Sequence, residues 1–196
     1  MKNFYLIVFF LTFGCPAFSQ SSIKLDSWHL GTSLSFINEP QLKTGVGFNT
    51  GVAVQVVPKL NGIVNVEYMF ASSIKPDDVV LRVYNPNKSL SYVRIDVGLE
   101  KTIFKVGNLD FAVSTSLALR KRNEAFASVF YKQFPLEQTP RLVSETVYSS
   151  MWQLGDITSL KARFNLKKMF VGINGNYQLF SKNSFLSSGV FTGINF

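Results

Sequence analysis

The segment LSSGVFTGINF, residues 186–196, decides the fold because its side chains alternate strictly in character. Its mostly apolar face carries Leu186, Ser188, Val190, Thr192, Ile194 and Phe196. Its mostly small or polar face carries Ser187, Gly189, Phe191, Gly193 and Asn195. A period of two residues predicts a β-strand. Since the edge of such a terminal strand is exposed unless a neighbour pairs with it, a closed sheet is expected.

The same alternation occurs in seven earlier segments of the chain. We predict strands over residues 27–37, 44–57, 63–71, 89–104, 109–120, 154–166 and 169–180. Turn signals interrupt the pattern at 58–62, 106–108 and 167–168. Together with the last segment this makes about eight strands, the smallest even number in single-chain transmembrane barrels.

The polar faces of these strands predict an unusual interior. Their residues are mostly small, which suits the crowded inside of a narrow barrel. Their charges balance, with Glu67, Asp96, Glu100 and Asp110 against Arg94, Arg120, Lys161 and Arg163. Because a buried charge needs a partner, we predict an internal salt-bridge network. A soluble barrel would place its charges outside and its apolar residues within, so this pattern favours a membrane barrel.

The expected fold is all-β, an antiparallel up-and-down transmembrane β-barrel of about eight strands. The terminal strand ending in Phe196 resembles the last strand of bacterial outer-membrane barrels, which commonly end in an aromatic residue. The chain as a whole resembles the small OmpA/OmpX-type barrels and the PorT-like barrels linked to secretion. This resemblance rests on architecture over residues 27–196. It implies an outer-membrane location, with Phe196 as part of the signal for insertion.

The amino-terminal residues predict export. Lys2 precedes an apolar run over residues 4–13, which is shorter than the roughly 20 residues of a spanning helix. Ala17 and Ser19 form a cleavage site, so we expect a signal peptide over 1–19, cut before Gln20. Residues 20–26 would form a short periplasmic lead, and 27–196 the barrel. The alternative, acylation of Cys15, is weakened by Thr12, where lipoprotein signals favour leucine.

The links between strands sort by length. With the amino terminus in the periplasm, the turns after the second, fourth and sixth strands face the periplasm and are short. The links over 72–88 and 121–153 are long and face outward. Aromatic residues cluster at both strand ends, as in interfacial girdles. Trp28, Phe111, Phe164 and Phe196 are assigned to the periplasmic end, and Phe36, Phe48, Phe70 and Tyr177 to the outer end.

The second long link is the best candidate for a binding element. Its candidate residues are Lys121, Arg122, Phe130, Tyr131, Lys132 and Arg141. Exposed aromatic residues would suit a partner surface. The alternative is that residues 125–131 and 145–153 extend the flanking strands as a hairpin, which could still carry a binding tip. With Lys75, Arg82, Lys88 and Lys182, these cations would form a rim that contacts the phosphates of lipopolysaccharide.

Catalytic chemistry is sparse in this sequence. His29 with Ser33 or Ser35, and a carboxylate such as Glu67 or Glu100, would be needed for a hydrolase. Outer-membrane deacylases carry an H-x-S spacing on the lipid side, whereas Leu30 and Gly31 follow His29 here. We therefore expect no enzyme but a barrel with a structural or binding role through its outer loops, as an accessory of a larger envelope or secretion complex. The alternatives are a lipid-modifying enzyme and a narrow solute channel.

Cofactors and nucleic acid are not expected. One histidine and one cysteine, the latter in the signal segment, cannot make a four-ligand zinc site. The net charge of +8 is not arranged as a basic run interleaved with aromatics, so nucleic acid is not an expected partner. The expected partners are outer-membrane lipid, lipopolysaccharide and an envelope protein, with the oligomeric state left open.

Overall fold

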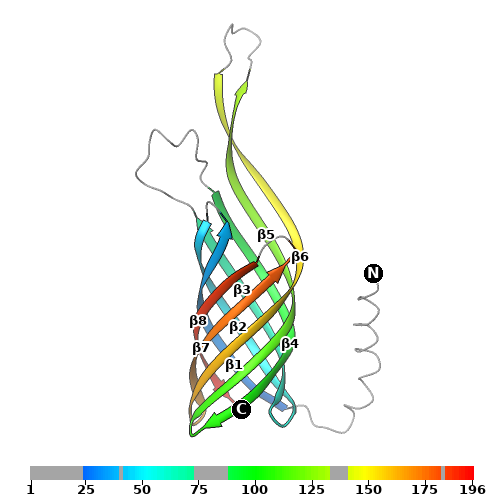
Figure 1. Cartoon of the computed structure of the whole chain (residues 1–196), viewed down its shortest axis with the longest axis vertical. Helices are drawn as coiled ribbons and strands as arrows, with labels where there is room; N and C mark the ends of the chain where they lie inside the picture. Colours follow the sequence, from blue (N-terminus) through cyan, green and yellow to red (C-terminus); the bar gives the residue numbers. More distant parts are fainter. Residues whose placement is uncertain (1–23, 40–41, 73–87, 133–140, 182–183) are drawn as a thin grey trace, which may run out of the picture.

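Eight long β-strands make up the described part of the chain (Figure 1). The computed structural model describes residues 24–39, 42–72, 88–132, 141–181 and 184–196. The strands are β1 Lys24–Glu39, β2 Leu42–Val57, β3 Leu60–Ser72, β4 Lys88–Val106, β5 Leu109–Lys132, β6 Arg141–Leu166, β7 Met169–Phe180 and β8 Ser184–Asn195. Within these residues, no helix is long and apolar enough to cross a membrane.

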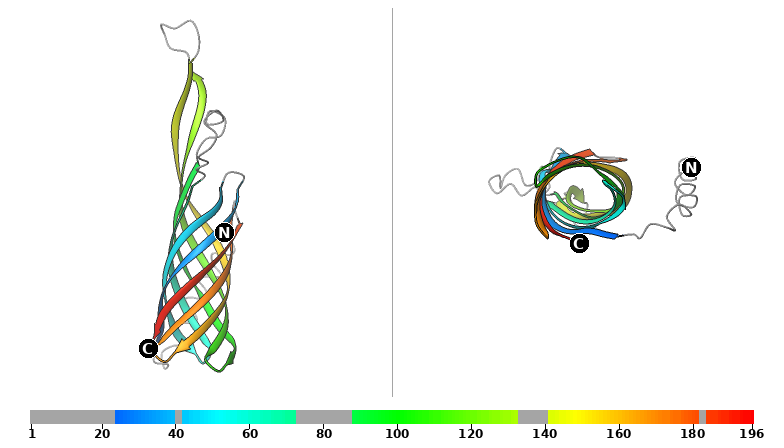
Figure 2. Two further views of the ribbon diagram at one scale, coloured as in Figure 1. Left: turned by 90° about the vertical axis from the view of Figure 1, so that its left-hand side faces the viewer. Right: turned by 90° about the horizontal axis from the view of Figure 1, so that it is seen from below.

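The strands close into a ring in which each pairs antiparallel with the next (Figure 2). Closure comes from β1 and β8, whose register runs from Ser27 opposite Asn195 to Ile37 opposite Phe185. Trp28 lies opposite Ile194, so the terminal strand has the neighbour that its alternating pattern requires. The predicted fold class, an eight-stranded antiparallel barrel, is confirmed.

The strand boundaries differ from the predicted ones mainly at the ends. β1 begins at Lys24, so residues 24–26 belong to the barrel and not to the lead. β3 begins at Leu60, because the turn before it is confined to Pro58 and Lys59. β5 and β6 continue to Lys132 and from Arg141, which confirms the hairpin alternative and extends it. The predicted signal peptide lies outside the described residues.

Three two-residue turns lie together at one end of the barrel, which we call the turn end; the opposite end is the hairpin end. Each turn holds one residue with positive φ: Lys59 at 68°, Gly107 at 58° and Lys167 at 55°. Glycine suits these positions because it has no Cβ, whereas other residues cost roughly 1–2 kcal/mol there. Two of the three turns therefore hold a lysine where glycine would be less strained.

The exterior of the ring is apolar and the interior is polar, which is the reverse of a soluble barrel. Outward residues such as Leu160 and Val190 are 64% and 60% exposed, whereas inward Ser33 and Ser187 are 3% exposed. The outward aromatic residues Trp28, Phe36 and Phe70 lie towards strand ends. Phe48 does not, since it pairs with Thr32 near the middle of β1, so its assignment to the outer girdle was wrong.

Two glycines on neighbouring strands give a matched test of the close packing inside the ring. A Cβ on Gly193, which faces inward, would meet the Trp28 carbonyl oxygen and the Phe170 ring, whereas one on Gly175 would meet nothing. We expect Gly193→Ala to destabilise the barrel by about 1–3 kcal/mol through overpacking. Gly175→Ala should be neutral or gain about 0.5–1 kcal/mol. Urea unfolding in lipid vesicles measures both, and equal effects would contradict the packing described.

Candidate functional site

The barrel interior holds a first group of ion pairs around Arg94. The Arg94 guanidinium lies 2.5 Å from Glu67 Oε2 and 3.1 Å from Asp96 Oδ2. Glu67 also accepts hydrogen bonds from Ser33 Oγ at 2.7 Å and from the Tyr92 hydroxyl at 3.1 Å. Asp96 accepts from Asn65 Nδ2 at 2.6 Å. All three charged groups are at most 5% exposed, so this desolvated group is held together by mutual pairing.

A second group lies on the strands closer to the turn end. Lys161 Nζ lies 2.6 Å from Glu100 Oε2, and Arg163 Nη1 lies 3.9 Å from Glu100 Oε1. Asp110 accepts from Asn165 Nδ2 at 2.7 Å and faces the largely exposed Lys105 at 3.5 Å. The two groups together place Glu67, Asp96, Glu100, Asp110, Arg94, Lys161 and Arg163 in ion pairs, as predicted for these interior charges.

Arg120, the eighth, lies in an aromatic cage. Its guanidinium carbon is 3.7 Å from the Phe180 ring centre, 4.7 Å from that of Phe185 and 5.3 Å from that of Tyr92. Its Nε donates to Gln153 Oε1 at 3.0 Å. Arg120 is 0% exposed, so the aromatic faces and the amide oxygen take the place of water around its charge.

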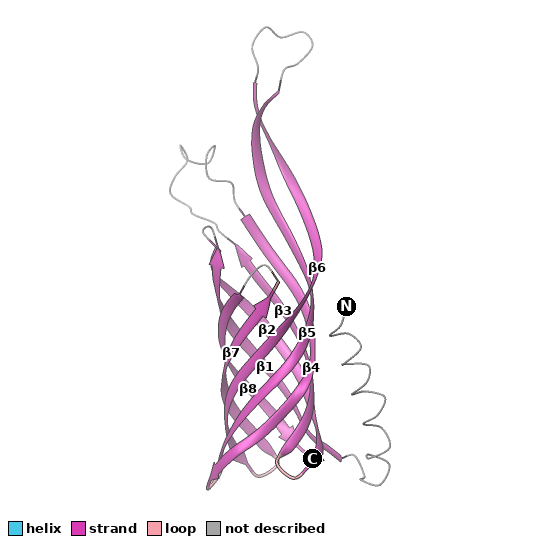
Figure 3. Ribbon diagram, turned by 45° about the vertical axis from the view of Figure 1, so that its right-hand side comes forward, coloured by secondary structure: helices cyan, strands magenta, loops and turns pink. Residues whose placement is uncertain are grey.

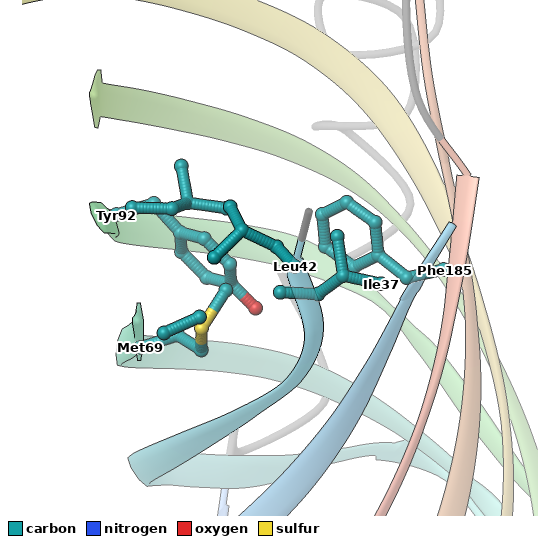
Figure 4. Close-up of a cluster of buried hydrophobic side chains, with 7 residues drawn as sticks. Ile37, Leu42, Met69, Tyr92 and Phe185 are labelled. Carbon is teal, nitrogen blue, oxygen red and sulfur yellow. The ribbon is translucent and has the colours of Figure 1, made fainter. Parts of the chain in front are cut away.

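An apolar cluster, which we call the plug, fills the lumen beside this cage at the hairpin end. Figure 4 shows its side chains converging from opposite walls of the ring. The plug consists of Ile37, Leu42, Met69, Ala71, Leu90, Tyr92 and Phe185. Between the ion pairs of the first group and His29 lies a cavity of about 30 Å³, which is room for about one water molecule. The described lumen is therefore filled by side chains at the hairpin end and around the first group, while a wider cavity of about 250 Å³ lies at the turn end beside Asn61, Asp110 and Arg163.

The predicted cationic rim is only partly at the surface. Arg122 is buried at 3% exposure and pairs with Glu124, which also lies 3.3 Å from Lys88. Its assignment as an available loop cation was therefore wrong, because it lies on the inner face of the sheet. Lys121 is exposed on the outer face, with its ammonium 5.8 Å from the Trp152 ring centre. Lys75, Arg82 and Lys182 lie outside the described residues.

The remaining predicted residues lie on the hairpin and at the chain end. Phe130 and Tyr131 are in β5, and Lys132 pairs with Arg141 where the described hairpin ends. The side chains of these four residues lie outside what the structure describes. Phe196 follows β8, is 71% exposed, and donates its backbone N–H to the Asp26 carbonyl oxygen at 3.0 Å.

The β5–β6 hairpin projects well beyond the other strands (Figure 3). β4 stops pairing with β5 at Phe126, and β7 stops pairing with β6 at Gly155. Among the described residues, no strand covers the far edge of β6 over residues 141–154. Tyr148 and Trp152, on the same face of this segment, are 79% and 64% exposed. The hairpin thus offers free main-chain hydrogen-bonding groups beside exposed aromatic rings.

The residues considered for hydrolysis do not assemble into a catalytic arrangement. Ser33 donates to Glu67, and His29 packs edge-on against the Phe191 ring at 5.7 Å between ring centres. A nucleophilic serine needs a hydrogen bond to its base, and here its hydroxyl is engaged by a carboxylate. Among the described residues, no group of His, Cys, Asp and Glu side chains could hold a metal ion.

Sequence reasoning missed the caging residues Tyr92, Gln153, Phe180 and Phe185. Each stands two residues from a predicted inward position or continues an inward series, so the period of two carried the signal. Gln153 and Phe185 were missed because each lies one residue before a predicted strand, whereas Tyr92 and Phe180 lie inside predicted strands. Aromatic size also suggested the exterior, whereas these rings face into the lumen and are at most 5% exposed.

The fold is similar to that of solved outer-membrane proteins. Ail, the attachment invasion locus protein of Yersinia pestis, in complex with the heparin analogue sucrose octasulfate, aligns with a TM-score of 0.56 and 12% identity, covering 88% of this chain and 99% of that chain. A major outer membrane protein from Thermus thermophilus aligns with a TM-score of 0.55 and 11% identity, covering 87% and 98%. No family model and no curated protein matches the sequence. At these identities the likeness shows the fold alone, that of small outer-membrane β-barrels.

Interior pairing can be tested by removing one charge. We expect Glu67→Gln to cost up to about 3–5 kcal/mol, because it removes the nearer of the two carboxylates that pair with the buried Arg94 and leaves only Asp96. The control Lys105→Gln should cost less than about 1 kcal/mol, because Lys105 is largely exposed and water screens its ion pair with Asp110. Urea unfolding in vesicles measures both. Similar losses in the two variants would mean that the interior pair is as well hydrated as the exposed one.

Proposed function

We propose that this protein spans the bacterial outer membrane as a closed barrel and binds an extended segment of an envelope or external protein along the free edge of its β5–β6 hairpin. The uncovered edge of β6 carries this proposal. The barrel is then a rigid support that holds the hairpin above the membrane. Export by the signal peptide and insertion aided by Phe196 belong to the same proposal.

The membrane location is supported by the polarity of the ring. In lipid every main-chain polar group needs an internal partner, and a closed barrel provides one for each strand. The exterior consists largely of aliphatic and aromatic residues, which suit hydrocarbon. Lys121 beside Trp152 stands above the apolar belt at the hairpin end. A cation and an indole at this level are suited to the phosphate region of lipopolysaccharide.

Binding by the hairpin is supported by the lack, within the part of the chain that the structure describes, of the usual protection of a sheet edge. Natural proteins guard exposed edges with lysine, proline, bulges or a covering segment. Residues 145–154, ETVYSSMWQL, contain neither lysine nor proline and are rich in residues that favour strands. An added strand would satisfy the free main-chain groups and cover Tyr148 and Trp152, which is the usual mode of β-augmentation.

Transport and catalysis are less well supported. The plug and the ion pairs occupy the lumen, and the one polar cavity among the first group of ion pairs holds about one water. Ser33 and His29 do not contact each other as a nucleophile and base would. We therefore assign no catalytic residue and no cofactor.

Conductance should separate a closed barrel from a channel. Because the plug fills the lumen, the purified protein in a planar bilayer should give no current steps above background. A general porin reconstituted in the same bilayers serves as the positive control. Reproducible steps from folded protein would show that the lumen opens and would favour the channel alternative.

Binding along the edge can be tested with two matched substitutions to lysine, one on each strand of the hairpin. Asn123 and Ser150 lie opposite each other and are joined by a hydrogen bond of 2.8 Å, but only Ser150 is on the uncovered strand. A photoreactive residue at Tyr148 should form protein adducts in intact cells. Ser150→Lys should reduce them at least roughly tenfold by blocking strand addition. Asn123→Lys adds the same charge and removes the same hydrogen bond between residues 123 and 150. It should leave the yield of adducts unchanged.

The position of the adducts provides the second readout. Peptide mapping should place each adduct within an extended segment of the partner. Equal adduct yields from Ser150→Lys and Asn123→Lys would contradict strand addition at β6. A photoreactive residue at Val66, on the apolar exterior, should yield lipid adducts and serves as the control for random collision.

A further inference from the structure

A long apolar groove crosses the outside of the barrel. It has a volume of about 840 Å³, and its lining passes from β5 through β6, β7, β8 and β1 to β2. Its apolar walls include Leu30, Phe48, Phe164, Val171 and Val190. Small residues, Thr32 and Thr192, make it hollow between these walls. No residue of β3 or β4 lines it, so the groove belongs to one side of the ring.

Two exposed lysines lie next to the turn end of this groove. Lys167 and Lys168 form the turn between β6 and β7, two of the strands that line it. Phe164 pairs with Val171 in the groove wall, and Leu166 pairs with Met169 immediately before the turn. At roughly 3.3 Å per residue, the lysine pair lies about 10 Å along the strands from the wall. A positive charge therefore stands next to one end of a hydrocarbon-lined trough.

The backbone at Lys167 is a second, independent observation. Its φ of 55° is a value at which glycine is favoured in a two-residue hairpin turn. Gly107 occupies the corresponding first position in the turn between β4 and β5, so this barrel does use glycine there. Strain at such a position is consistent with a role for the side chain that is present. Lys59 shares this strain, and Lys167 differs from it because its turn joins two strands that both line the groove beside it. The Lys167 ammonium is the group that such a role would use.

We propose that this groove and lysine pair form a binding site for an anionic phospholipid of the periplasmic leaflet. An acyl chain lies in the groove, and the phosphate contacts Lys167 and Lys168. The apolar lining selects hydrocarbon, while the two ammonium groups favour a headgroup with net negative charge. This site rests on the membrane location proposed above but not on the hairpin, which lies at the opposite end of the barrel.

The two tryptophans of the chain allow a direct measurement. Trp152→Phe leaves Trp28, which pairs with Ile194 and precedes Leu30 on the outer face of β1 beside the groove. The probes are vesicles of phosphatidylcholine doped with brominated phosphatidylglycerol or brominated phosphatidylcholine. Bromine quenches a nearby indole. If the site exists, brominated phosphatidylglycerol should reach half-maximal quenching at a lower mole fraction than brominated phosphatidylcholine. The difference in mole fraction should be roughly twofold or more.

Matched variants then locate the headgroup contact. Lys167→Asn with Lys168→Ser should abolish the preference for phosphatidylglycerol. Lys59→Asn with Lys101→Ser removes the same charge at the same end, with Lys59 also at positive φ. Lys59 lies in the β2–β3 turn and Lys101 on β4, and the only groove residue on these strands is Phe48, far along β2 from Lys59. This control should keep the preference. Thr32→Phe should fill the groove and abolish it, whereas Val66→Phe, outside the groove, should not.

The outcomes separate this site from the membrane location itself. Folding of each variant is verified by its shifted gel migration without boiling. Equal quenching by both brominated lipids in the Trp152→Phe protein would overturn the phospholipid site and leave the membrane location intact. An equal loss of preference in both lysine variants would overturn it as well, because general surface charge would then explain the preference. No quenching by either lipid would overturn both the site and the membrane location.

Discussion

The main-chain pairing of β1 with β8 is the constraint on which the rest of the structure depends. It removes both sheet edges and encloses a lumen that is only wide enough for side chains. Inside that ring a polar group cannot keep its water, so each charge must find a partner. The paired charges around Arg94 and Glu100, the caged Arg120 and the small residues on inward positions all follow from this confinement.

The same hydrogen-bonding requirement separates the two halves of the molecule. Within the ring every strand has two neighbours, and this allows the outer surface to be apolar without leaving main-chain groups exposed to lipid. Over residues 141–154, which lie on the hairpin side of Gly155, the β6 strand has only one neighbour among the described residues. The barrel therefore suits a lipid environment, and the hairpin suits water and a protein partner.

Much of the fold could be predicted from the sequence because a strand exposes alternate residues to different surroundings. The period of two identified the eight strands and placed residues such as Glu67, Arg94 and Glu100 inside. The prediction failed where a strand continues beyond the part that spans the membrane. Arg122 continues the inward series of Arg120, yet it was assigned to a loop because the apolar alternation weakens beyond the membrane belt. The assignment of Phe48 to the outer girdle failed for another reason. An aromatic residue type alone does not indicate the height of the residue along a tilted strand.

The sequence by itself determined which face each residue takes, because the side-chain period of a strand is local. It also determined that the ring must close, since a mostly apolar terminal strand needs a partner. Only the tertiary structure decided which charges meet, because partners such as Glu100 and Lys161 come from strands that are not neighbours in the chain or in the ring. It also decided that the lumen is plugged and that the edge of β6 is free. Both depend on strand register and stagger, which link residues across the whole ring.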